Sequence, residues 1–587
     1  MIAKLPDPEV FAMAKDLSDI ERATSVQGRA SRLRPIQDGF EAAVRAHGAK
    51  DISKFWIDNL VGLTLPAGRL GAALSIPGVL DWDEVRSDGR DATVYWDMTH
   101  VRAAAGFNDY IDAGYRGQSG SRAYAGQAPV RVGIMEFQRQ DISALNWVSW
   151  NHPGLVTGRL LNARICSAAL CAESSGWLPS YSSHGTATTG FVAGSIEGFG
   201  GPFIYTPEDE VARSGVSSGA TMHYYLVGTT EALIRGLEDG VGTLALDLMN
   251  MSFTICDRCG ANTPGYDCGF INGAIRNALN NGLLVVAAAG NDGHAGIACT
   301  QGYPAILPET LAVGGYDSSW NGQTVLADKP VAGNYYPDGG GITGTARGGV
   351  AMRTFAGTSS AYAGVDILGP YHVGYAYGNP ADPLKVYYPF SGTSASAPVL
   401  TGALALLKSG FYGLRGRQLS AKELIPLALV MGDSFAHVAD GVANTYIRAD
   451  MSDVSGAGRL RMRLPSNAAF PGQAWQFDAG SFDLRSTDVR IGELATPFTH
   501  HRYALTWYGE STDALSDVDV AAYRVCGGTE TLIRAHADFD PRKRLHTLGT
   551  DVPPGCTLRV KVAPVAFPPG KTLRLYDAWL WHNGVDP

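Results

Sequence analysis

The chain has 587 residues, of which 18% are charged and 45% are hydrophobic, and its formal net charge is −9. This composition argues against an intrinsically disordered chain and against a coiled coil. The acidic balance excludes non-specific DNA binding as a main activity, because such binding needs a basic surface. At about 150 residues per domain, the length predicts several folding units.

The N-terminal segment and the cysteines give evidence on the cellular location of the protein. Residues 1–22 are charged throughout and contain no apolar core, so no secretory signal is visible there. No run reaches the roughly 18 apolar residues that a membrane span needs. The eight cysteines nevertheless indicate an oxidising compartment. We therefore expect a secreted or periplasmic protein whose signal has been removed, with no nucleic-acid and no membrane partner.

The cysteines fall into two close pairs and one group of four. We expect disulfides in the pairs Cys166/Cys171 and Cys526/Cys556, and in the group Cys256, Cys259, Cys268 and Cys299. A zinc site is the alternative for the group, because Cys256 and Cys259 have ligand spacing. Cys268 and Cys299 do not form a second closely spaced pair, which argues against zinc.

The sequence predicts three domains, at 1–93, 94–450 and 451–587. In the first, a helix is expected over 11–49, a strand over 55–65 and a short helix over 67–75. In the second, apolar strand-like runs alternate with amphipathic helical stretches at 230–241 and 270–282. The strands are expected at 130–136, 221–227, 244–253, 283–290 and 311–315. Such alternation predicts an α/β fold, with a doubly wound parallel sheet covered on both faces.

The last domain has a different pattern. After about Met451 the helical stretches end, and short alternating segments such as RYALTWYG and TLRLYDAWLW follow. Alternation of apolar and polar residues over short runs is typical of antiparallel strands with one buried face. We expect an all-β sandwich here.

Three segments of the middle domain carry chemistry. Ser394 lies in a Gly-Thr-Ser turn before an apolar helix, where the helix dipole favours developing negative charge. His184 precedes a run of small residues, and Asn291 follows the apolar strand 283–290. Taken singly, each has an ordinary structural explanation: a helix cap, a structural histidine and a turn residue. Only the three segments taken together suggest a candidate site.

Together these segments resemble the subtilisin-like serine proteases, the subtilases, over about residues 95–440. MNMSF (249–253), YPAILPETLAVGGYD (303–317) and VDILGP (365–370) are similar to intervening signatures of that family. The resemblance implies a subtilisin-like sheet, with Ser394 as nucleophile, His184 as general base and then acid, and Asn291 as a donor to the oxyanion. It also implies that the strand residues Met251, Ser252, Phe253, Ala288, Ala289 and Gly290 bind extended substrate backbone.

The acid of the triad departs from the family pattern. Where subtilases end the first core strand with Asp, this chain has Glu136. A glutamate can also orient a histidine, as in some α/β-hydrolases, although it is one methylene longer. Asp141 from the next loop and an incomplete triad are the alternatives. A sedolisin-type site does not fit, because that family lacks a catalytic histidine and has Asp where this chain has Asn291.

A second Gly-Thr-Ser sequence, at Ser359, is a competing nucleophile. It lacks a proline four residues later and an apolar helix after it, and it precedes the VDILGP segment instead of following it. We therefore assign the nucleophile to Ser394.

The flanking domains have resemblances of their own. Residues 56–85 are similar to the subtilase propeptide, a small α/β domain that assists folding and then occupies the cleft. This implies a zymogen that cleaves itself between about Asp83 and Asp97. The C-terminal segment resembles the jelly-roll sandwich that follows many subtilase domains, with a role in stability or substrate docking, or simply as a structural appendage.

The predicted function is that of a serine endopeptidase acting through an acyl-enzyme, with protein or peptide substrates and its own propeptide as partners. A peptide ligase or macrocyclase and a catalytically silent binding protein are the alternatives. No cofactor or catalytic metal is expected. Structural calcium is common in the family, and the acidic loop Asp513–Asp519 is a candidate site, although solvated carboxylates are the commoner case.

Overall fold

The structure is a computed structural model of the whole chain, and it carries no ligand. It describes residues 2–4, 19–55, 60–66, 69, 72–73, 75–77, 79, 81–83, 98–117, 130–138, 148, 155, 160–174, 184–195, 214–255, 269–290, 303–305, 307, 309–316, 330–332, 367–370, 387–390, 393–433, 459–460, 462, 475–487, 489–494, 500–508, 517–536, 545–566, 570 and 572–582. The chain divides into two compact units, Met1–Val94 and Tyr95–Pro587.

The N-terminal unit is a four-stranded antiparallel sheet with a long helix, α1 (Asp19–Arg45). The strand order is β2-β3-β1-β4, with β1 Ile2–Lys4, β2 Lys50–Phe55, β3 Leu60–Thr64 and β4 Asp81–Asp83. The single strand predicted over 55–65 is wrong: β2 and β3 are separate antiparallel neighbours. Of the short helix predicted over 67–75, residues 72–73 are helical among those described.

A small hydrophobic core supports this unit. Phe40 and Val44 of α1 pack with Val61 and Leu63 of β3 and with Ala73, and all five are buried. The unit therefore has an apolar core of its own, as a separately folding segment requires.

The second unit is built on a seven-stranded sheet with the order β11-β10-β9-β5-β8-β6-β7. All neighbours are parallel except β6 and β7. The strands are β5 Arg131–Phe137, β6 Leu160–Cys166, β7 Cys171–Glu173, β8 Thr221–Val227, β9 Leu248–Met251, β10 Leu284–Ala288 and β11 Thr310–Val313. The predicted parallel α/β sheet is confirmed. The sequence reading missed β6 and β7.

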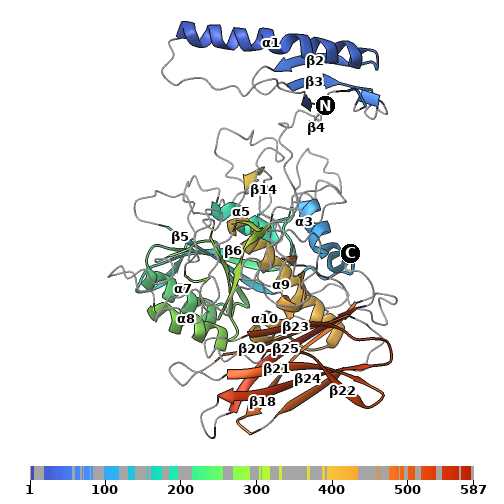
Figure 1. Cartoon of the computed structure of the whole chain (residues 1–587). Coiled ribbons are helices and arrows are strands. Elements are labelled where there is room, and N and C mark those ends of the chain that lie inside the picture. The colour runs from blue at the N-terminus through green and yellow to red at the C-terminus, as the bar shows by residue number, and fades with distance from the viewer. Residues whose placement is uncertain are drawn as a thin grey trace. The chain divides into compact units, whose positions relative to one another are not determined.

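Helices cover both faces of this sheet (Figure 1). Alternate residues of a strand belong to different cores. On β5, Ile134 belongs to the core shared with α5 (His184–Ala193) and α9 (Thr393–Arg415). Met135, the next residue, belongs to the core shared with α7 (Thr230–Gly242) and α8 (Gly269–Asn280). Because Glu136 is two residues after Ile134, it lies on the α5 and α9 face.

Helix α9 is the central helix of this unit. It is long and apolar enough to cross a membrane by length and composition, but 78% of its most apolar window is buried inside the protein, which accounts for its composition. Gly402 lets α9 approach α5 closely, because a Cβ atom there would lie 2.9 Å from the carbonyl oxygen of Val192. Two further helices, α3 (Met98–Ala105) and α4 (Phe107–Asp112), precede β5, and α10 (Ala421–Val430) follows α9.

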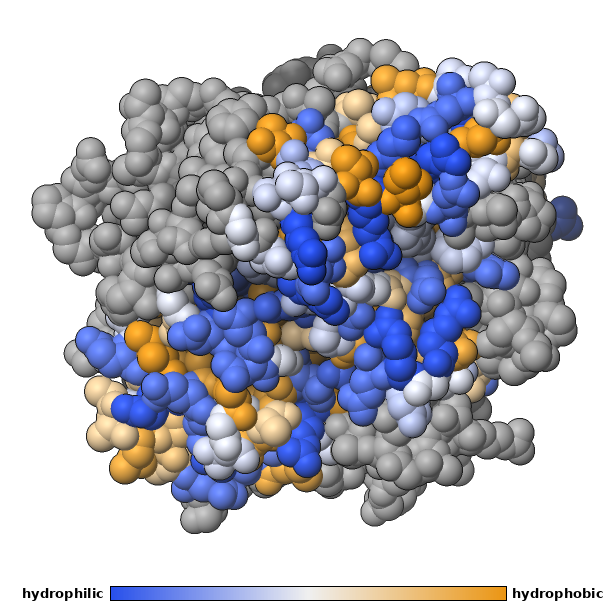
Figure 2. Space-filling view, turned by 90° about the horizontal axis from the view of Figure 1, so that it is seen from below, coloured by the Kyte–Doolittle hydropathy of each residue, from blue (hydrophilic) through white to orange (hydrophobic). Residues whose placement is uncertain are grey.

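The C-terminal strands form two four-stranded antiparallel sheets, as predicted, with the orders β18-β25-β20-β23 and β19-β24-β21-β22. The strands are β18 Trp475–Arg485, β19 Arg490–Leu494, β20 His500–Trp507, β21 Asp517–Cys526, β22 Thr529–His536, β23 Leu545–Asp551, β24 Thr557–Ala566 and β25 Thr572–His582. A core that includes Leu484, Leu505 and Val560 draws on both sheets. Hydrophilic and hydrophobic residues are interspersed on the surface of this region (Figure 2). Its assignment as a jelly roll remains a prediction.

The C-terminal sheet that contains β18, β20 and β25 shares a core with the parallel sheet and its helices. Phe477 of β18 stacks on Phe411 of α9 with ring centroids 6.1 Å apart, and Arg415 donates to the Phe477 carbonyl at 2.7 Å. Ala578 and Leu580 of β25 belong to the same apolar cluster as α5, α9 and β5. One continuous core therefore spans both parts of the second unit.

Six short strands complete the described structure in three antiparallel pairs. They are β12 Gly315–Tyr316 with β13 Pro330–Ala332, β14 Ile367–Pro370 with β15 Tyr387–Phe390, and β16 Gly432–Asp433 with β17 Arg459–Leu460.

Both predicted cysteine pairs are disulfides, Cys166–Cys171 and Cys526–Cys556. They fit an extracellular location. The other four cysteines lie outside the described residues.

Candidate active site

Glu136 and His184 meet at the carboxyl end of the parallel sheet. Glu136 is the sixth residue of β5, and His184 is the first residue of α5, which packs over that strand. His184 Nδ1 lies 2.8 Å from Glu136 Oε2. The carboxylate is fully buried, whereas the imidazole is 28% exposed, so one side of the ring can meet solvent or a ligand.

Thr188 holds the other oxygen of the same carboxylate. It follows His184 by one helical turn, so both side chains face Glu136 from α5. Its hydroxyl donates to Glu136 Oε1 at 2.8 Å and also lies 3.2 Å from the carbonyl oxygen of Gly185. Each oxygen of Glu136 therefore has a defined neighbour. Thr188 was not singled out from the sequence, although its spacing of four from His184 is a usable signal.

The charge of Glu136 controls the protonation of His184. Burial lowers the pKa of His184, but the negative charge of Glu136 and its contact with the ring raise it more. The pKa of His184 therefore lies above its ordinary value. A ring placed in this way accepts a proton readily and keeps Nδ1 turned to the carboxylate.

Phe390 packs against the histidine ring. The two ring centroids are 5.3 Å apart in an edge-on arrangement, and Phe390 also lies 5.8 Å from the Phe191 ring of α5. This aromatic contact restricts the orientation of the His184 ring. Nothing in the local sequence around 390 marks it for this role.

Ser394 is the second residue of α9, and two hydrogen bonds join it to Ser252, just after β9. The Ser394 hydroxyl donates to the Ser252 carbonyl at 3.2 Å, and the Ser252 hydroxyl donates to the Ser394 carbonyl at 3.1 Å. In a regular helix that carbonyl would accept from the N–H of residue 398, which is Pro398 and has none. Ser252 supplies the donor that the proline lacks.

Two buried polar side chains extend this connection. Asn250 of β9 donates to the Ser252 hydroxyl at 3.0 Å, and the Thr401 hydroxyl of α9 lies 3.3 Å from Asn250 Oδ1. On the next strand, the N–H of Gly290 donates to the Thr393 hydroxyl at 3.1 Å. The start of α9 is thus tied to the ends of both β9 and β10.

The strand residues expected to bind substrate follow β9 and β10. Met251, Ala288 and Ala289 are buried. Met251 is the last residue of β9 and lies between Met135 of β5 and Ala287 of β10, and Ala288 pairs with Val313 of β11. Phe253 is half-buried and packs on Phe137, with ring centroids 5.7 Å apart. Among the described residues no cluster of three or more metal-ligating side chains occurs.

Several candidate residues lie outside the described part of the chain. They are the oxyanion candidate Asn291, the alternative acid Asp141, the alternative nucleophile Ser359 and Asp513 of the acidic loop. The structure brings Glu136 to His184 and Ser394 to Ser252, all at the carboxyl ends of parallel strands, where open α/β sheets bind their ligands.

Part of the chain is similar to known proteins. The family model described as "Subtilase family" matches residues 159–428. Subtilisin DY of Bacillus licheniformis is 28% identical over 268 residues, which are 45% of this chain and 77% of that protein. Subtilisin E of Bacillus subtilis (strain 168) is 28% identical over 274 residues, or 46% of this chain and 56% of that protein, so the chain spans about half of its length.

Among solved structures, the prenylagaramide maturation protease PagA is similar at 19% identity and a TM-score of 0.39, over 61% of this chain and 96% of that one. Residues 159–428 thus match the model of a subtilase family domain, and this match together with the subtilisin relatives supports a hydrolase of the serine endopeptidase class.

Proposed function

We propose that the subtilase domain of this chain is a serine endopeptidase that works through a Glu136–His184–Ser394 triad. The observation that carries the proposal is the 2.8 Å contact between His184 Nδ1 and the buried Glu136 carboxylate. With Nδ1 turned to Glu136, the other ring nitrogen is the one left to accept the Ser394 proton. Glu136 then stabilises the imidazolium that forms.

The nucleophile acts from the start of α9. Ser394 Oγ attacks the substrate carbonyl and gives its proton to His184, which returns it to the leaving amine; water then attacks the acyl-enzyme with His184 again as base. For the first transfer, the Ser394 O–H must turn away from the Ser252 carbonyl. The helix N-terminus and Asn291 would stabilise the oxyanion, and loss of such an Asn in a subtilisin costs about 10²–10³ in turnover.

Substrate would bind along the residues that follow β9 and β10. The backbone of 251–253 and 288–290 is proposed to pair with an extended peptide on either side, as an added strand. Peptide bonds of proteins are therefore the proposed substrates. The chemistry needs no cofactor, and calcium would have a structural role only.

The N-terminal unit is proposed to be a propeptide. In support, residues 1–94 form a compact unit with their own apolar core. Cleavage between about 83 and 97 would release it. The proposal predicts that the wild-type chain splits in this window during purification, whereas Ser394→Ala stays intact.

The deciding experiment is intact mass spectrometry after treatment with a fluorophosphonate, which reacts with activated serines. The wild-type chain and Ser359→Ala should each gain one adduct, and Ser394→Ala should gain none. Loss of labelling in Ser359→Ala alone would move the nucleophile to Ser359. A wild-type chain that stays unlabelled after removal of its N-terminal unit would exclude a working triad and favour a binding protein. Product masses from a test peptide separate hydrolysis from ligation.

A further inference from the structure

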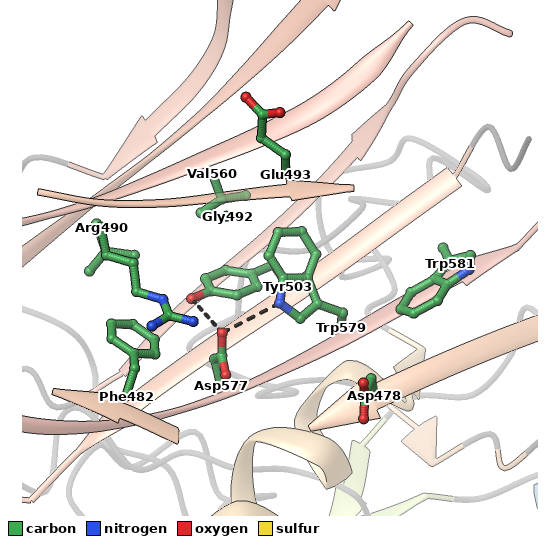
Figure 3. Close-up of a pocket in the computed structure, with 11 residues that line it drawn as sticks. Asp478, Phe482, Arg490, Gly492, Glu493, Tyr503, Val560, Asp577, Trp579 and Trp581 are labelled. Atoms are coloured by element: carbon green, nitrogen blue, oxygen red, sulfur yellow. Dashed lines mark hydrogen bonds between the residues drawn. The ribbon is translucent and has the colours of Figure 1, made fainter. Parts of the chain in front are cut away.

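A pocket of about 210 Å³ lies between the two C-terminal sheets (Figure 3), and none of its lining residues belongs to the candidate active site. Its volume is below the roughly 300–1,000 Å³ of sites for drug-sized ligands, so it suits one ring-sized group. Aromatic rings and charged side chains line it together. Those that carry the argument are Asp478, Phe482, Arg490, Asp577, Trp579 and Trp581.

Strand register brings these side chains to one wall. Trp579 of β25 lies directly between Asp478 of β18 and Tyr503 of β20. Asp577 and Trp581 are two residues before and after Trp579, so they face the same side of the sheet. The core residues Leu573 and Leu575 lie on the same face of β25. Asp577, Trp579 and Trp581 continue along that face, with polar and aromatic groups in place of aliphatic ones. The pocket is where the apolar core of the sandwich ends.

Gly492 of β19 shapes the opposite wall. A Cβ atom at this position would lie 3.2 Å from Cζ2 of Trp579, closer than carbon atoms normally pack. Any larger residue would press on the indole ring. Trp579 is also fixed from the other side by Tyr503, with ring centroids 4.5 Å apart. The indole is therefore held in a set position at the pocket wall.

Asp577 presents one oxygen to the pocket. The Tyr503 hydroxyl donates to Asp577 Oδ2 at 3.3 Å, and the indole N–H of Trp579 lies 3.4 Å from the same oxygen (Figure 3). In the part of the chain that the structure describes, Oδ1 accepts no hydrogen bond. Burial raises the pKa of this carboxyl, while Arg490 and the two donors lower it. A ligand that donates to Oδ1 would complete the satisfaction of this buried group.

Arg490 supplies donors from the other side. Its guanidinium lies 3.9 Å from the centre of the Phe482 ring and is directed to the side of the pocket where Asp577 lies (Figure 3). Among the described residues its N–H groups make no hydrogen bond, so up to five donors are available. The pocket thus combines a stacked cation, a buried acceptor and fixed indole rings.

These groups narrow the ligand to one class. A cation would be repelled by Arg490, and an anion by the carboxylates Asp478, Glu493 and Asp577. A purely apolar group would leave Arg490 and Asp577 Oδ1 without a hydrogen-bond partner. A neutral ring with hydroxyl groups avoids each cost, since its hydroxyls donate to carboxylates and accept from guanidinium while its C–H face packs on an indole. We propose that this pocket binds a sugar residue of pyranose size, so that the C-terminal sandwich docks the enzyme on carbohydrate.

The test uses the full chain as Ser394→Ala, so that proteolysis cannot interfere. Saturation-transfer NMR is run with D-glucose, D-galactose, D-mannose and N-acetylglucosamine, and with choline, lysine and inorganic phosphate as competing classes. We expect saturable binding of at least one sugar and of none of the other three. Arg490→Ala should weaken it about tenfold or more, because the lost bonds involve a charged donor.

Two variants separate binding from folding. Arg485→Ala, an exposed arginine on β18 that does not line the pocket, should bind the sugar like the parent. Trp579→Ala should abolish binding, and a melting curve is recorded beside it to detect unfolding. The proposal is overturned if no sugar binds, if choline, lysine or phosphate binds instead, or if sugar binding survives Arg490→Ala unchanged.

Discussion

Ser252 and Ser394 are joined by reciprocal hydrogen bonds, each hydroxyl donating to the other residue's carbonyl, at 3.1 and 3.2 Å. One of these bonds replaces the helical N–H that Pro398 cannot provide. The position of the proposed nucleophile therefore depends on a side chain that is 142 residues away in sequence.

Removing the Ser252 side chain should lower kcat only because it changes the position of Ser394. Ser252→Ala leaves a largely buried carbonyl without its donor, at a cost of about 1–3 kcal/mol, and kcat should fall about tenfold. Restoring the backbone N–H with Pro398→Ala should recover part of the loss in the double variant. A double-mutant cycle on kcat measures this coupling. Ser409→Ala, which removes a buried hydroxyl farther along α9, is the control and should leave kcat unchanged. Additive effects of Ser252 and Pro398 would contradict the explanation.

Neutralising the carboxylate should change both rate and pH dependence. In Glu136→Gln, kcat/KM should fall by about 10⁴, the order found when the acid of a Ser-His-Asp triad is replaced by its amide. Without the negative charge the pKa of His184 drops, so the acid limb of the pH–rate profile moves to lower pH. Glu238→Gln, an exposed glutamate on α7, is the control. If the acid limb stayed at the same pH in Glu136→Gln, the pKa of His184 would not depend on the charge of Glu136.

The same pair contributes to stability in a defined pH range. The pKa of His184 is raised in the folded state, so its charged form stabilises the fold below the unfolded pKa, and this stabilisation is lost as pH rises through the folded pKa. The difference in unfolding free energy between wild type and Glu136→Gln should therefore be larger near pH 5 than near pH 9. Urea titrations at both pH values measure it. An equal difference at the two values would contradict the linkage.

Thr188 is expected to position the proposed acid. Thr188→Val removes the hydrogen bond to Glu136 Oε1, and a bond to a charged group contributes about 1.5–3 kcal/mol. We expect kcat/KM to fall at least tenfold and the acid limb of the pH profile to shift. Thr189→Val is a matched control, since Thr189 is equally buried but donates to the Gly185 carbonyl and not to Glu136. Equal profiles for the two variants would show that Thr188 acts only through stability.

The close approach of α5 and α9 can be tested at Gly402. In Gly402→Ala the new methyl group would lie 2.9 Å from the carbonyl oxygen of Val192 on α5, so the helices must separate, at a cost of about 1–3 kcal/mol. We expect kcat to fall even when the variant is fully folded, because α5 carries His184 and α9 carries Ser394. Gly273→Ala on α8, where the methyl group meets no atom within 4 Å, should stabilise instead. Denaturant melts and kcat on the two variants decide this.

The two disulfides should differ in what they contribute. The chain-entropy model gives about 3.7 kcal/mol for Cys526–Cys556, which are 30 residues apart, and about 2 kcal/mol for Cys166–Cys171, which are 5 apart. Paired serine substitutions with urea unfolding measure both. A larger loss at the short loop would show that strain or residual structure outweighs chain entropy.

Local pattern predicted the elements whose signal is local. Strands such as 221–227 and 130–136 are continuous apolar runs, and the helices at 230–241 and 270–282 have regular periodicity, so they agree with the structure within a few residues. The division of 55–65 into two strands was missed because the apolar pattern was read through the whole segment, although Asp58 and Asn59 are residue types that favour turns.

The candidate site residues were likewise predicted where the signal is local in the sequence. Ser394, His184 and Glu136 were predicted because each lies in a motif that resembles one family, and the structure places Glu136 beside His184. Thr188, Asn250 and Phe390 act through contacts with residues that are distant in sequence. A sequence gives residue types and their spacings. The contacts of Thr188, Asn250 and Phe390 form only when the fold brings β5, β9 and α9 together.

The shared core beneath α9 and α10 limits how this enzyme can be divided or rebuilt. Since Phe477, Ala578 and Leu580 of the C-terminal strands pack in the same cluster as α5 and α9, the C-terminal strands cannot be removed without exposing that core. A truncated chain would expose the far end of α9, the helix that carries Ser394 near its start. Grafting this peptidase onto another tail, or trimming the tail to a minimal enzyme, would therefore require redesign of that apolar surface first.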